Sequence, residues 1–167
     1  PILKRANNLG SIMKIEALEG ETHPLVLALT RKYAAIAMNP PYMGSGNMNA
    51  ELAKYVKDNY DEEKADLFAV FMQVAEDHLL PKAKYGMINM QSWMFITSFM
   101  KVRKHIIDDL QIDNMLHLGP RTFDEIGGEV VQNTAFVITN AEPSCSSYYF
   151  RLFDFAPSDV KKEIFIN

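Results

Sequence analysis

Short apolar runs alternate along this chain with segments whose apolar residues recur at helical spacing. Each run stops at a polar or turn-forming residue, and the runs cover residues 33–38, 85–90, 112–118 and 134–139. Runs of this kind are typical of strands buried in a parallel sheet. Apolar positions at intervals of three and four predict helices over residues 49–60, 66–80 and 97–110.

Weaker patterns occupy both ends of the chain. Residues 147–153 alternate as in a strand, and residues 158–165 suit the start of a helix. Residues 9–18 and 24–30 are each compatible with a helix. Pro81 is expected to end the helix over residues 66–80, because proline cannot continue a helical hydrogen-bond pattern.

The order strand, helix, strand, helix, strand, strand predicts an α/β sandwich with mostly parallel strands. Asn39, Gln91 and Gly119 directly follow three of the predicted strands. Because the carboxyl ends of parallel strands meet at one edge of a sheet, we expect the three loops on one rim. Open α/β sheets bind their ligands beyond that rim.

Composition limits the classes of protein to consider. The chain has 167 residues, of which 48% are hydrophobic, so it has the size of one globular domain. It begins at Pro1 rather than Met, which favours a piece of a longer protein. No stretch is apolar enough to span a membrane. The single cysteine, Cys145, cannot form an intrachain disulfide, which suits the cytoplasm. The four histidines are widely separated and have no cysteine partner, so we expect no metal site.

The net charge of −4 argues against a free-standing nucleic-acid-binding domain, which is usually basic. The charge is compatible with a catalytic domain whose main DNA-binding residues lie elsewhere in the protein. The densest basic cluster, Lys101, Arg103 and Lys104, is interpreted as the solvated face of a helix rather than a binding patch.

The most informative tetrapeptide is Asn39-Pro40-Pro41-Tyr42, directly after the first predicted strand. Its two prolines stiffen the turn. The Asn39 amide oxygen and the Pro40 carbonyl can both accept from one exocyclic amine, and Tyr42 offers a ring on which a base can stack. Two acceptors on one amine favour its lone pair for attack, as N-methylation of adenine requires. The competing interpretation is a plain strand-ending turn.

The sequence resembles the N6-adenine DNA methyltransferases, whose fourth motif is Asn-Pro-Pro-Tyr. It is most similar to the large adenine-specific methyltransferases of BREX-type phage-exclusion systems, and more loosely similar to type IIG restriction–modification enzymes. The resemblance covers roughly residues 32–140 and rests on four motifs in the family's order: NPPYMGSGNMN from Asn39, DLFAVF from Asp66, MQSWMF from Met90 and FDEIGGEVVQ from Phe123.

The resemblance implies roles for particular residues. Asn39 and the Pro40 carbonyl would hold the adenine N6, and Tyr42 would stack on the flipped base. Pro41 and Phe123, the family's second aromatic, would complete the base pocket. Flipping is needed because the target nitrogen is inaccessible within a duplex.

Two further residues keep alternative interpretations. Asp66 matches a helix-start residue near the family's cofactor pocket, and an N-cap is an equally good explanation. Trp93 follows a strand end and would line either the rim or the core. The basis for a cofactor role of Asp66 is therefore weak.

The cofactor implied is S-adenosylmethionine, but the family's Gly-rich binding motif does not precede Asn39. The chain thus resembles the C-terminal half of a Rossmann-like methyltransferase sheet, mostly parallel with an antiparallel last strand. We expect a helical lead-in over residues 1–31, a partial catalytic domain over 32–140 and the start of a following segment over 141–167.

The expected function is part of a site-specific, cytoplasmic DNA methyltransferase of a restriction–modification or phage-defence system. Its partners would be double-stranded DNA with a flipped adenine and other subunits of such a system. One alternative is a non-catalytic methyltransferase-like module that binds DNA or a partner. Another is an enzyme acting on RNA or on a protein glutamine amide.

Overall fold

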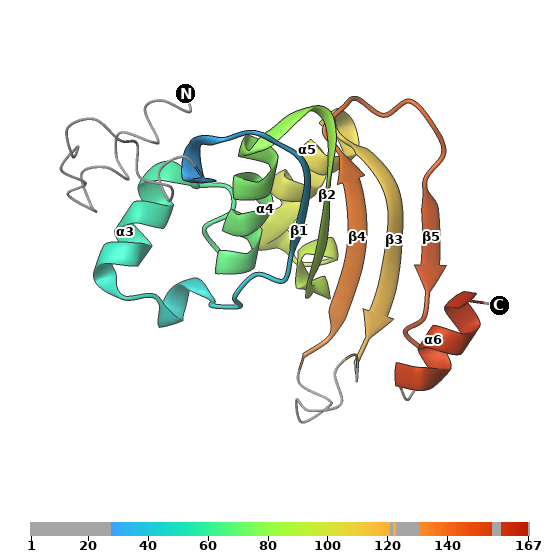
Figure 1. The fold of residues 1–167 in the computed structure, drawn as a ribbon. Helices are drawn as coiled ribbons and strands as arrows, with labels where there is room; N and C mark the ends of the chain where they lie inside the picture. Colours follow the sequence, from blue (N-terminus) through green and yellow to red (C-terminus); the bar gives the residue numbers. More distant parts are fainter. Residues whose placement is uncertain (1–27, 121, 123–130, 155–157, 167) are drawn as a thin grey trace.

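The computed structural model describes residues 28–120, 122, 131–154 and 158–166, and it is drawn as a ribbon in Figure 1. One five-stranded sheet has the strand order β1-β2-β4-β3-β5. The strands are β1 (Tyr33–Met38), β2 (Leu79–Met90), β3 (Gln111–Gly119), β4 (Asn133–Thr139) and β5 (Tyr148–Arg151). The helices are α3 (Ala50–Asn59), α4 (Leu67–Asp77), α5 (Met100–Asp109) and α6 (Ser158–Ile166), with 3-10 turns at Ser45–Asn47, Gln91–Met94 and Thr97–Phe99.

The sheet is mixed in the way that the sequence predicts. β1 is parallel to β2, and β3 is parallel to β5. β4 lies between β2 and β3 and is antiparallel to both. The expected antiparallel strand is β4, the last strand of residues 32–140, whereas β5, which follows it, is parallel to β3. Because β1, β2 and β3 point the same way, their carboxyl ends form one rim, at the lower edge of the sheet in Figure 1.

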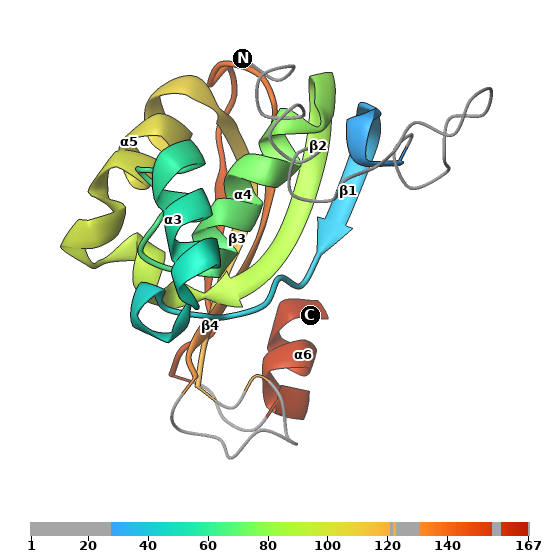
Figure 2. The ribbon, with the colours of Figure 1, turned by 90° about the vertical axis from the view of Figure 1, so that its left-hand side faces the viewer.

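A layer of helices covers one face of the sheet. Figure 2 places α3, α4 and α5 together on that face, while α6 lies apart from them near the rim. Alternate residues of β2 point toward the helices, and Tyr85, Met87 and Asn89 are buried there. Phe68 of α4 packs at 5.3 Å between ring centroids against Phe99. Burying one such aromatic side chain stabilises the fold by about 2–3 kcal/mol.

Pro81 does not end a helix, and that prediction is wrong. α4 stops at Asp77, and Pro81 lies within β2. The β1–β2 register passes from Tyr33↔Leu79 to Ala35↔Lys84, so β2 carries extra residues between these pairs. A proline is tolerated in such an irregularity because it need not donate to the ladder.

The other boundaries follow the predictions closely. α3 begins after Asn49, whose side chain accepts from the Leu52 N–H as an N-cap. The helix expected over residues 97–110 is divided into a 3-10 turn and α5. The expected lead-in over residues 1–31 lies mostly outside the described residues.

Candidate active site

The Asn39–Tyr42 turn leaves the carboxyl end of β1 at the rim. Asn39 and Pro41 are exposed, Pro40 is buried and Tyr42 is half-buried. The amide of Asn39 is therefore accessible to a ligand, while the buried Pro40 fixes the turn to the body of the domain. The exposure of Asn39 is compatible with its expected contact to a ligand, and the roles of the four residues of the turn stay predictions.

Both the hydroxyl and the ring of Tyr42 contact other residues. Its hydroxyl accepts a hydrogen bond from the Asn133 side-chain amide at 3.0 Å. Its ring meets the ring of Phe68 edge-on, with centroids 6.2 Å apart and planes at 83°. Partial burial raises the pKa of the Tyr42 phenol above its ordinary value, and the donated hydrogen bond from Asn133 works against that rise. The phenol is therefore neutral at physiological pH.

Asp66 is the N-cap of α4, and it also anchors the turn. Its Oδ1 accepts from the Phe68 N–H at 3.2 Å and from the Met43 N–H at 3.0 Å. The Leu67 N–H donates to the Met43 carbonyl at 3.0 Å. The residue after Tyr42 is thus bound to the first turn of α4. The N-cap interpretation is confirmed, and a cofactor role for Asp66 stays a prediction.

A chain of buried polar groups runs beneath the rim. Asn133, the first residue of β4, donates to Tyr42 and also to the Asn89 carbonyl at 3.3 Å. The Asn89 side-chain oxygen in turn accepts from the indole N–H of Trp93 at 3.0 Å. Trp93 is 3% exposed, so it belongs to the core rather than to the rim surface.

Asn133 and Asn89 are not among the site residues predicted from the sequence. A signal was present, because each is an amide in or beside an apolar strand, YGMINM and NTAFVIT. Buried polar side chains require hydrogen-bond partners, so such residues point to a network. Which partners they take depends on the pairing of β2 with β4, where Asn89 faces Thr134 and Asn133 faces Met90.

Phe123 lies outside the described residues, so its expected place against the base stays a prediction. Both ends of the segment that carries it are at the rim, at Gly119 and Asn133. Gly119 has φ +67°, and an added Cβ would lie 2.5 Å from Phe153 Cδ2. Lys161 of α6 is buried and donates to the carbonyls of Leu118 and Pro120. The start of the segment is therefore firmly fixed.

More polar groups continue the rim toward β3. Gln91 bonds to Gln132, and the Gln91 side-chain oxygen meets His117 Nε2 at 2.5 Å. The His117 ring lies between Phe95 and Phe153, with centroids 5.8 Å and 5.0 Å away. Burial lowers the pKa of His117, and the nearby Arg151 charge lowers it further. His117 is therefore neutral near pH 7.

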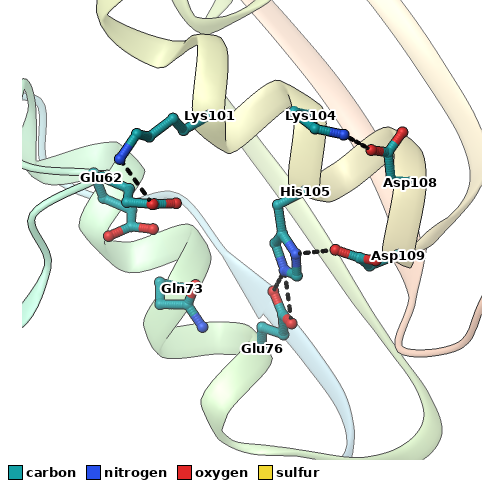
Figure 3. Close-up of a pocket in the computed structure, with 9 residues that line it drawn as sticks. Glu62, Gln73, Glu76, Lys101, Lys104, His105, Asp108 and Asp109 are labelled. Atoms are coloured by element: carbon teal, nitrogen blue, oxygen red, sulfur yellow. Dashed lines mark hydrogen bonds and ion pairs between the residues drawn. The ribbon is translucent and has the colours of Figure 1, made fainter.

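A separate groove of about 510 Å³ lies between α4 and α5. Figure 3 shows its side chains, which come from both helices and from the loop before α4; none belongs to the Asn39–Tyr42 turn. His105 bonds to Glu76 across the groove at 2.9 Å and to Asp109 at 2.8 Å. These carboxylates, Glu76 above all, raise the pKa of His105 to about 9. No group of three or more His, Cys, Asp or Glu side chains among the described residues is arranged to hold a metal ion.

Comparisons of the sequence agree on one family. The sequence model described as Eco57I restriction-modification methylase matches residues 4–123. The adenine-specific methyltransferase PglX of Lacticaseibacillus casei (strain Zhang) is 43% identical over 140 residues. The adenine-specific methyltransferase BrxX of Escherichia coli O9:H4 (strain HS) is 42% identical over 127 residues. These matches cover 83% and 75% of this chain but only 12% and 10% of the relatives, so the chain spans about a tenth of their length.

Solved structures agree on the fold. A type I restriction–modification complex matches with a TM-score of 0.61 and 18% identity, over 79% of this chain and 26% of the other. A class I S-adenosylmethionine-dependent methyltransferase from Listeria monocytogenes matches with a TM-score of 0.59 and 15% identity, over 83% and 42%. The DrdV–DNA complex matches with a TM-score of 0.58 and 19% identity, over 81% and 16%. The α/β methyltransferase fold expected from the sequence is confirmed.

Proposed function

Because this chain belongs to the Eco57I restriction-modification methylase family, we propose that it forms the adenine-binding part of a site-specific DNA methyltransferase. The longer protein transfers a methyl group from S-adenosylmethionine to N6 of an adenine flipped out of double-stranded DNA. The observation that carries this proposal is the Asn39–Tyr42 turn at the rim, with Asn39 exposed and Tyr42 held from two sides.

The residues of the turn act on the amine of the target base. The Asn39 side-chain oxygen and the Pro40 carbonyl accept its two hydrogens, which directs the nitrogen lone pair away from the ring. Tyr42 and Phe123 stack on the base, and each stacked base gains about 1–3 kcal/mol. Pro41 closes the edge of the pocket. Each contact is made before reaction, so the base is oriented in advance.

The described residues fit the base better than they fit the cofactor. The acidic side chain next to the turn, Asp66, already uses Oδ1 to bind two backbone N–H groups. Residues 1–38 contain no Phe-x-Gly-x-Gly sequence of the kind that the resemblance leads one to expect in the cofactor site. S-adenosylmethionine would supply the methyl group, and its main binding residues would come from elsewhere in the longer protein.

The proposal extends to the organisation and partners of the longer protein. Residues 32–140 are part of its catalytic domain, and residues 141–167 begin the next segment, whose β5 extends the same sheet beside β3. We infer that other subunits of a restriction–modification or phage-defence system are further partners, and that the reaction takes place in the cytoplasm. In the described part of the chain, the helices are too short or too polar to cross a bilayer.

Methyl transfer by the full-length protein tests the proposal. Purified protein is incubated with radiolabelled S-adenosylmethionine and genomic DNA, and N6-methyladenine is measured in the digested DNA. We expect product with the native protein and at least a 100-fold lower rate with Asn39→Ala. Because Asn39 is exposed, the unfolding temperature should not change. DNA binding without methylation by the native protein would instead support a non-catalytic binding module, and methylation of RNA or a glutamine amide would change the substrate class.

A further inference from the structure

The side-chain amide of Asn133 is fixed on both of its donor directions. Asn133 is 1% exposed, and its Nδ2 lies 3.0 Å from the Tyr42 hydroxyl and 3.3 Å from the Asn89 carbonyl. A carboxamide nitrogen has two hydrogens, so each of these acceptors receives one. The bond to the β2 backbone therefore sets the orientation of the amide that reaches Tyr42.

The two hydrogen bonds of Asn133 connect three parts of the fold. Tyr42 follows β1, Asn89 lies near the end of β2, and Asn133 begins β4. A further restraint on the Tyr42 ring is its edge-on contact with Phe68, which comes from α4. The hydrogen bond from Asn133 adds to this packing by fixing the position of the hydroxyl at the end of the ring.

We propose that Asn133 is a positioning residue for methyl transfer, because it fixes through the Tyr42 hydroxyl the ring on which the adenine stacks. This inference rests on the proposed function. A displacement of a reacting group by about 1 Å from its productive position can lower the reaction rate about 100-fold.

A double-mutant cycle on methyl-transfer rates tests the inference. Asn133→Leu, Tyr42→Phe and the double variant are made in the full-length protein, and kcat and the KM for DNA are measured for each. Asn133→Leu keeps the side-chain volume without the donor, and Tyr42→Phe keeps the ring without the acceptor. We expect each single variant to lower kcat 10-fold to 100-fold, with KM within about threefold. The double variant should be no slower than the slower single variant, since both changes remove one interaction.

Thr134 provides the matched control, because it is the next residue of β4, is equally buried and donates to the Leu116 carbonyl instead. Thr134→Val should lower the unfolding temperature, because it removes a buried hydrogen bond. Its kcat should stay within about threefold of the kcat of the native protein. If Asn133→Leu does not fold, Tyr42→Phe decides: a kcat equal to that of the native protein overturns the inference, and a loss of 10-fold or more supports it.

The inference is also overturned if folded Asn133→Leu has a native kcat, or if the two single losses multiply in the double variant. Failure of the proposed function gives a different result. In that case the native protein and Asn39→Ala both leave adenine unmethylated, and the positioning role falls with the function on which it rests.

Discussion

The carboxylate of Asp66 binds the Met43 N–H at 3.0 Å, and so joins the residue after the Asn39–Tyr42 turn to the start of α4. The same oxygen caps the helix through Phe68. One side chain therefore contributes both to helix capping and to turn placement, and a change there should affect stability and activity together.

Replacing Asp66 by alanine removes both hydrogen bonds. We expect Asp66→Ala to lower the free energy of unfolding by about 1–2 kcal/mol, as loss of an N-cap does, and to reduce methylation by the full-length protein. Asp66→Asn retains an accepting oxygen and is the matched control. Recovery of both properties in Asp66→Asn would leave the N-cap as a sufficient explanation. Recovery of thermal stability alone would favour a role toward the cofactor.

Gly119 should not tolerate a side chain. Its φ of +67° disfavours other residues, and a Cβ would meet Phe153 at 2.5 Å. We expect Gly119→Ala to destabilise the chain by about 2 kcal/mol or more, measured by urea unfolding. Gly46→Ala is the control, because nothing lies within 4 Å of its added Cβ. Equal stability of the two variants would contradict the strain at Gly119.

Stability should fall as the pH rises from about 6.5 to about 9. His105 has a raised pKa of about 9 when folded, against 6.5 for an unperturbed histidine, so folding favours its protonated form. Its contribution is complete below pH 6.5 and is lost as the pH passes through 9. Because the side chain is 36% exposed, screening limits the effect to about 1 kcal/mol.

Thermal unfolding of His105→Gln checks this prediction across the same pH range. The variant keeps hydrogen-bonding capacity but cannot carry the charge. We expect it to lose the decline in unfolding temperature between pH 6.5 and 9. A decline as steep as that of the native chain would mean that other groups cause it.

This chain by itself should bind S-adenosylmethionine only weakly. The Gly-rich motif with which the family binds S-adenosylmethionine is not found in residues 1–38. The carboxylate of Asp66 already accepts hydrogen bonds from two backbone N–H groups. We expect isothermal titration of the chain alone to give no saturable heat up to about millimolar cofactor. A micromolar dissociation constant would contradict this expectation and place a cofactor site within the chain.

The sequence predicted the parts of the fold that depend on local pattern. The four apolar runs became β1 to β4, and the Asn39–Tyr42 turn lies at the rim because strand polarity follows from the order of the elements. Pro81 lies within β2 instead of ending a helix because a register irregularity between β1 and β2 accommodates it. Local sequence contains no information about that irregularity.

The candidate site was predictable only in part, for the same reason. Asn39 and Tyr42 belong to a contiguous motif, and Asp66 is a helix-capping residue at the start of an apolar helix. Asn133 reaches Tyr42 across 91 positions of sequence, through the pairing of strands that adjoin only in the folded sheet. Its role becomes visible only when β4 is placed between β2 and β3.

Because β4 pairs antiparallel with β3, the two strands form a hairpin. The connection between Gly119 and Asn133 begins and ends at the same edge of the sheet. Insertions or deletions in this connection need not shift any strand, because Gly119 and Asn133 anchor it from both sides. Doubling the length of such a connection costs only about 0.6 kcal/mol in loop-closure entropy. Related proteins can therefore vary the length of this stretch beyond Phe123 while β3 and β4 keep their places.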